Sequence, residues 1–133
     1  MSYGTSVTLD MPFADALGRV RAALAEQGFG VLTEIDVTAT MRAKLGEEME
    51  DYVILGACNP PAARQALAVD RSIGLLLPCN VVVRSSGDGG STVEVLDPTV
   101  ISQVSDATGL DEIASEASEK LQTALDALVN TSS

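Results

Sequence analysis

Residues 73–98 read IGLLLPCNVVVRSSGDGGSTVEVLDP, and this stretch decides the fold class. Two apolar segments rich in valine, 73–86 and 91–98, flank the glycine-rich segment GDGG at 87–90. This pattern is typical of a β-hairpin, with an interruption or bulge of the first strand expected at Pro78. Because the strands of a hairpin are antiparallel, the pattern predicts a mainly antiparallel sheet.

The rest of the chain supplies further strands and helices. Strands are predicted where apolar and β-branched residues alternate or cluster, at 6–11, 29–37 and 52–59. Helices are predicted where apolar residues recur at helical spacing or follow capping residues, at 12–27, 38–50, 60–70 and 110–129. We therefore expect an α+β fold, a single domain over residues 1–133 with two layers, in which helices pack on a mainly antiparallel sheet.

Local signals define several helix ends. Asp10 could cap the first helix, and Gly28 is placed to end it. Gly46 would end the second helix. Asn59 lies directly before a proline, and its side chain is suited to cap the third helix.

The strand at 73–86 also bears on assembly. It is apolar at nearly every position between Gly74 and Val83, so both of its faces should be buried. If helices cover one face of the sheet, a second copy of the chain could cover the other, and we expect a homodimer. The alternative is that one of the short helices crosses to the second face.

Charge and composition exclude several classes of partner. The 133 residues include 19 acidic and 8 basic side chains, which give a formal net charge of −11. Nucleic acid and anionic lipid require clustered Lys and Arg, which the sequence lacks, so neither is an expected partner. No charged and apolar leader opens the chain, and its longest apolar runs are about half a membrane span. We expect a soluble, cytoplasmic protein that does not enter a membrane, with thiols rather than a structural disulfide.

Histidine is absent from the sequence. Its absence excludes Ser-His-Asp and Cys-His catalysis and metal ligation by imidazole. Enzymatic activity stays open, and no cofactor is indicated.

The two cysteines have similar neighbours. Cys58 and Cys79 are each followed by an asparagine, Asn59 and Asn80, with a proline beside each pair. If the cysteines lie directly opposite one another on adjacent strands, a separation of about 4.5–5.5 Å would overlap disulfide geometry. Two thiolates are too few for a structural zinc site, although Cu(I) accepts fewer ligands. The remaining interpretation is that both cysteines pack as small buried residues.

Four segments together resemble the DUF302 family, also called the TT1751-like domain: GFGVLTEIDV, ILGACNPP, IGLLLPCNVVV and the Asp97–Pro98 pair. The resemblance runs from Tyr3 to Val129. It implies an α+β domain with a TBP-like topology, decorated by extra helices and forming a dimer, and the topological name does not imply DNA binding. It brings no catalytic residue. The matching motif positions are Thr33, Glu34, Asp36, Gly56, Cys58, Asn59, Pro60, Pro78, Cys79 and Asn80.

We therefore expect a dimeric module that binds a small ligand or a partner segment. The candidate ligand-binding residues are Cys58, Asn59, Cys79, Asn80, Thr33 and Glu34. One alternative is a thiol-dependent redox or sulfur-handling protein in which both cysteines cycle together. Another is an assembly domain whose dimer surface is its function. Glu34 and Asp36 could form an acid–base pair on one side of a strand, although ordinary solvent-facing alternation also explains them and is the preferred interpretation. No metal site is predicted.

Overall fold

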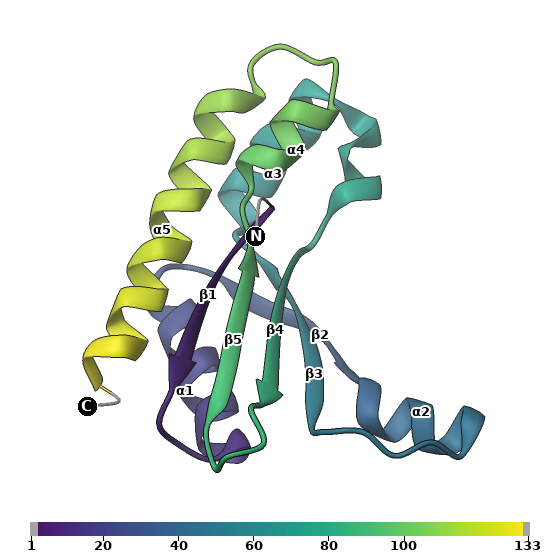
Figure 1. Cartoon of the computed structure of the whole chain (residues 1–133). Coiled ribbons are helices and arrows are strands. Elements are labelled where there is room, and N and C mark those ends of the chain that lie inside the picture. The colour runs from purple at the N-terminus through teal and green to yellow at the C-terminus, as the bar shows by residue number, and fades with distance from the viewer. Residues whose placement is uncertain (1–2, 132–133) are drawn as a thin grey trace.

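Five strands form one sheet in the order β1-β5-β4-β3-β2, with every neighbouring pair antiparallel (Figure 1). The computed structural model describes residues 3–131. The predicted α+β class, with helices packed on a mainly antiparallel sheet, is confirmed. The elements in chain order are β1 (Gly4–Leu9), α1 (Phe13–Glu26), β2 (Gly30–Asp36), α2 (Val37–Leu45), β3 (Tyr52–Cys58), α3 (Pro60–Val69), the 3₁₀ helix η1 (Arg71–Leu76), β4 (Cys79–Ser85), β5 (Ser91–Leu96), α4 (Thr99–Val104) and α5 (Leu110–Thr131).

The predicted hairpin lies at the centre of the sheet. β4 and β5 pair with Val83 opposite Val93 and Val81 opposite Val95. The turn between them includes Gly87, whose φ of +86° is a left-handed conformation that glycine adopts without steric penalty. The valine-rich strands and the glycine-rich turn therefore act as the sequence predicts.

The main core lies between the sheet and two helices, α1 and α5, which cover the same face (Figure 1). Side chains alternate across a strand, so every second residue of β3, β4 and β5 points toward these helices. The helices present apolar residues at helical spacing to meet them. The buried cluster is made of Leu9, Ala16, Val20, Leu24, Phe29, Val53, Leu55, Ala57, Val81, Val83, Val93, Val95, Leu121, Ala124, Leu125 and Leu128.

The opposite face of the central strands is less covered, and we call it the open face. Val82 is half-buried there, whereas its neighbours Val81 and Val83 are buried against the helices. The expectation that β4 has both faces buried therefore holds for the helix side only. Arg84 and Glu94 form an ion pair on the open face, with Nε donating to Oε1 at 2.9 Å.

The prediction of one long strand over residues 73–86 is wrong for the residues before Cys79. Residues 71–76 form the 3₁₀ helix η1, and the strand begins only at Cys79, after a cis peptide bond between Leu77 and Pro78. The side chain of Asp70 accepts a hydrogen bond from the Ser72 N–H and starts η1. Proline has no N–H to donate, so the sheet ladder cannot extend through it.

Three smaller expectations also need correction. Asp10 does not cap α1; the N-cap position is Pro12, which makes no side-chain cap. Strand β2 lies at the edge of the sheet and is mostly exposed, and it ends at Asp36, one residue before the predicted end of the strand. Helix α4 follows Pro98 where no helix was predicted, and Asp97 accepts a hydrogen bond from the Thr99 N–H at its start.

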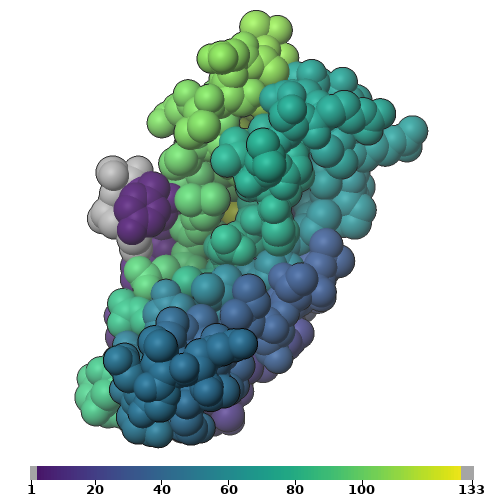
Figure 2. Space-filling view, turned by 90° about the vertical axis from the view of Figure 1, so that its right-hand side faces the viewer, coloured from purple at the N-terminus to yellow at the C-terminus, as the bar shows by residue number. Residues whose placement is uncertain are grey.

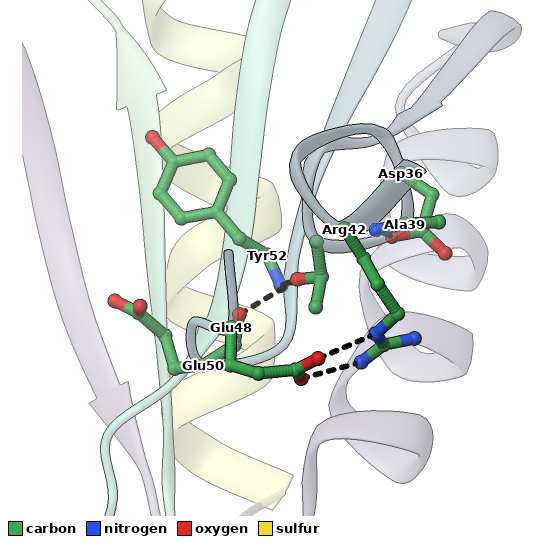
Figure 3. Close-up of polar contacts among 7 residues, drawn as sticks. Asp36, Ala39, Arg42, Glu48, Glu50 and Tyr52 are labelled. Atoms are coloured by element: carbon green, nitrogen blue, oxygen red, sulfur yellow. Dashed lines mark hydrogen bonds and ion pairs between the residues drawn. The ribbon is translucent and has the colours of Figure 1, made fainter. Parts of the chain in front are cut away.

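Helix α2 connects β2 to β3 and projects from one end of the sheet, whereas α3 and α4 lie at the opposite end (Figure 1). The Thr38 hydroxyl secures it by donating to the Glu50 carbonyl at 2.6 Å and accepting from the Tyr52 N–H at 2.9 Å. Arg42 and Glu48 form a two-bond ion pair across the following loop (Figure 3). Gly46 ends the helix with a φ of +66°, as predicted.

Candidate functional site

A cavity of about 370 Å³ lies beyond the end of the sheet at which β3 ends and β4 begins. We call it the sheet-end cavity. Helix α3, η1, α4 and the start of α5 surround it, and Figure 2 shows η1 in teal and α4 in green side by side at this end. Its lining is almost entirely apolar and includes Phe29, Leu32, Ala57, Cys58, Asn59, Ala63, Ala66, Ile73, Leu77, Cys79, Ile101, Ser102, Leu110, Ile113, Ala114 and Ala117.

Asn59 is held at the cavity wall because its side chain caps helix α3. Its Oδ1 accepts a hydrogen bond from the Ala62 N–H at 3.2 Å and caps α3, and Pro60 follows at the first helical position. Both features are the local signals expected of a helix start. Asn59 Nδ2 lies close to Gly28, where an added Cβ would be 3.2 Å away. The predicted capping role is therefore confirmed.

Cys58 and Cys79 lie on neighbouring strands but are not opposite one another. The register pairs Cys79 with Ala57, so Cys58 is offset by one residue. Strand alternation then directs the two side chains to opposite faces of the sheet. Both nevertheless border the sheet-end cavity, because the cavity lies past the end of the strands. Both are free thiols.

The two thiols differ in environment. Cys79 is 8% exposed, whereas Cys58 is half-buried. Burial raises the pKa of the Cys79 thiol from 9.0 to about 11, and the neighbouring Cys58 adds to the effect. A thiol reacts as its thiolate, so Cys79 is a poor nucleophile near neutral pH. Cys58 is the more accessible of the two.

The sheet-end cavity is electrically neutral within the described part of the chain. None of the described residues that line it is Asp, Glu, Lys or Arg. Across residues 3–131, no three His, Cys, Asp or Glu side chains are grouped so that they could hold a metal ion. The arrangement suits the enclosure of a molecule more than proton transfer to it.

The other three candidate residues lie elsewhere. Asn80 borders a second pocket, of about 270 Å³, on the open face, together with Tyr52 and Val82. Thr33 covers Gly56, which leaves no room for a side chain there. Glu34 faces the helices and forms an ion pair with Arg21. The structure thus brings Cys58, Asn59 and Cys79 together at one cavity, without Asn80, Thr33 and Glu34.

Most of the cavity lining was not singled out from the sequence. Ile113 and Ala117 lie within the predicted helix at 110–129, where apolar residues at helical spacing indicate a face packed on the core rather than a binding site. Ile101 lies on α4, which had no clear sequence signal. Leu32 borders the cavity because a register shift between Val31 and Thr33 makes a β-bulge. An irregularity of that kind is not visible in the alternation of the sequence.

Comparisons with known proteins agree with the fold described above. Residues 5–128 match the family model described as "Domain of unknown function DUF302". The crystal structure of the uncharacterized conserved protein DUF302 from Bacillus stearothermophilus superposes with a TM-score of 0.87 and 27% identity, over 96% of this chain and 99% of that one. No curated protein matches the chain. Among the described residues, no helix is long and apolar enough to cross a membrane. The chain belongs to the DUF302 family.

Proposed function

We propose that this protein is a single-domain module that binds one small molecule in the sheet-end cavity. The observation that carries the proposal is the cavity itself, at about 370 Å³ and bordered by both cysteines and Asn59. Small-molecule sites are typically concave, largely apolar and about 300–1,000 Å³ in volume, with few polar groups. The cavity has each of these properties. The net charge of −11 favours such a ligand over nucleic acid.

The proposal is tested by filling the cavity. Ala63 lines it from α3, and Ala63→Phe would occupy part of its volume. Ala68 lies exposed on the same helix, so Ala68→Phe is the matched control. We expect the wild type to bind one equivalent of an environment-sensitive naphthylamine dye, Ala68→Phe to bind equally well, and Ala63→Phe to bind far more weakly. Equal binding by both variants, with both folded by circular dichroism, would exclude the cavity as the site.

A second candidate function is reversible thiol oxidation, favoured by the fact that Cys58 and Cys79 border one cavity. A disulfide would form as the two thiols lose two protons and two electrons to oxidised glutathione, which becomes two molecules of glutathione. Intact mass after this treatment would fall by about two mass units per chain. Unchanged mass, or a mixed disulfide on Cys58 alone, would exclude the pair from such a cycle. The buried, protonated Cys79 makes this the less favoured function.

We also propose that the protein is a homodimer joined through the open face. That face holds Tyr52, Ile54 and Val82, and its charges Arg84 and Glu94 neutralise one another. Interface centres are depleted in unpaired charge, and two copies with a net charge of −11 need such a neutral area to associate. Two free thiols also fit a cytoplasmic location.

Sedimentation equilibrium tests the dimer. Val82→Asp places a charge at the centre of the open face and should yield monomers. Ala22→Asp adds the same charge on the exposed side of α1 and should leave the dimer intact. A monomeric wild type, or a Val82→Asp variant that stays dimeric, would rule out this interface.

A further inference from the structure

We infer that the ligand of the sheet-end cavity is an uncharged, apolar molecule and that Leu32 covers it once bound. This inference rests on the proposed function and narrows it to one chemical class. It draws on three separate features. These are the neutral lining, the hydrogen bonds that polar side chains of the wall already make within the protein, and the β-bulge at the mouth.

The neutral lining makes a charged ligand costly. None of the described residues that border the cavity can pair with an ion. Burying an ion without a partner costs several kcal/mol. An anion would also approach a protein with a net charge of −11. Cys79 keeps its proton at neutral pH, so it offers no negative charge to a cation.

Two polar side chains in the wall already make a hydrogen bond within the protein. Asn59 Oδ1 accepts from the Ala62 N–H at 3.2 Å. The Ser102 hydroxyl donates to the Thr99 carbonyl at 2.8 Å. The remaining polar groups among the described lining side chains are the Asn59 Nδ2 amide and the two thiols, and thiols are weak hydrogen-bonding partners. A ligand rich in hydroxyl or amide groups would therefore lose more hydrogen bonds to water than these few groups can replace.

Leu32 lies at the mouth of the cavity in an unusual position for a leucine. The register of β2 and β3 shifts between Val31 and Thr33, which leaves Leu32 without a paired residue in β3. Its side chain is 68% exposed although it borders the cavity. Bulges near binding sites serve to redirect a side chain. Contact with an apolar ligand would remove this exposed leucine surface from water, which favours binding.

Two pairs of dyes test the charge of the ligand. N-phenyl-1-naphthylamine is neutral, and 1-anilinonaphthalene-8-sulfonate differs from it by one sulfonate. Diphenylhexatriene is neutral, and its trimethylammonium derivative carries one positive charge. We expect each neutral dye to bind at least tenfold more tightly than its charged counterpart, and Ala63→Phe to abolish this binding. Equal affinities within both pairs would overturn the inference while leaving a binding cavity; failure of every dye to bind would remove the proposed function as well.

The proposed covering of the ligand by Leu32 is tested with a matched control on another exposed leucine. Leu45 is 64% exposed on α2 and does not border the cavity, so Leu45→Ala removes a comparable exposed leucine elsewhere. We expect Leu32→Ala to weaken binding of the neutral naphthylamine about tenfold, mainly through faster dissociation, and Leu45→Ala to leave it unchanged. Thermal denaturation should show similar stability for both variants. Unchanged dissociation from Leu32→Ala would show that Leu32 does not cover the ligand.

Discussion

The buried thiol of Cys79 should make the stability of the protein depend on pH in the alkaline range. Burial, reinforced by Cys58, raises the pKa of Cys79 from 9.0 to about 11 in the folded state. Between these two values the folded chain keeps a proton that the unfolded chain has released. Raising the pH therefore favours unfolding. The stabilisation is fully present below about pH 9 and is lost as the pH rises through 11.

The size of the effect follows from the same two values. Each unit of pKa difference corresponds to about 1.36 kcal/mol, so the two-unit difference sets an upper bound of about 2.7 kcal/mol. At about pH 10.5 the unfolded thiol is almost fully ionised and the folded thiol only partly so. The expected loss between about pH 8 and 10.5 is about 2 kcal/mol. This is a large fraction of the 5–15 kcal/mol typical of a folded domain.

The decrease in the free energy of unfolding with pH can be measured by urea unfolding, followed by circular dichroism under reducing conditions. Tyrosine and lysine also titrate in this range, so the wild type is compared with Cys79→Ala, in which only the buried thiol is missing. We expect the free energy of unfolding to fall by about 2 kcal/mol more in the wild type than in Cys79→Ala. Cys58→Ala should behave almost like the wild type, because burial is the larger cause of the shift. Equal losses in the wild type and Cys79→Ala would refute the reasoning.

Three further substitutions test local features by urea or thermal denaturation. Gly56→Ala would place a Cβ 2.7 Å from Pro78 Cγ and should destabilise the protein by about 1–3 kcal/mol, whereas Gly18→Ala, with no atom within 4 Å, should not. Thr38→Val leaves the Tyr52 N–H without its partner and should cost about 1–3 kcal/mol, with Thr38→Ser restoring stability. Asn59→Ala removes the cap of α3 and should cost about 1 kcal/mol, while Asn59→Asp should retain most of it.

The sequence predicted those features that depend on neighbours along the chain. The hairpin formed because valine-rich strands flank a glycine-rich turn, and Asn59 capped α3 because it precedes Pro60. The start of β4 was misjudged, since the apolar residues before Pro78 fit a strand and a 3₁₀ helix that buries only Ile73 equally well. Composition alone does not distinguish these two structures.

The candidate site was only half predictable for the same reason. Cys58 and Asn59 are consecutive at the end of β3, and both border the cavity because it lies past the end of the strand. Asn80 follows a cysteine as Asn59 does, but strand register places its side chain on the open face. Glu34 pairs with Leu55, farther along β3 from the end that borders the cavity. A one-residue offset decides which face a side chain occupies, and that offset is set by long-range pairing.

The position of β1 has a consequence for how the chain assembles during synthesis. β1 and β2 are consecutive in the sequence, yet they lie at opposite edges of the sheet. In the sheet β1 pairs with β5, which is the last strand to leave the ribosome. Leu9 therefore cannot pair with Ser91 until nearly the whole sheet has been synthesised. Until then Val7 and Leu9 have no strand beside them, and a nascent chain that stalls before β5 exposes an unpaired strand edge. The meander from β2 to β4 can form earlier, and the closing of the N-terminal strand onto β5 completes the domain.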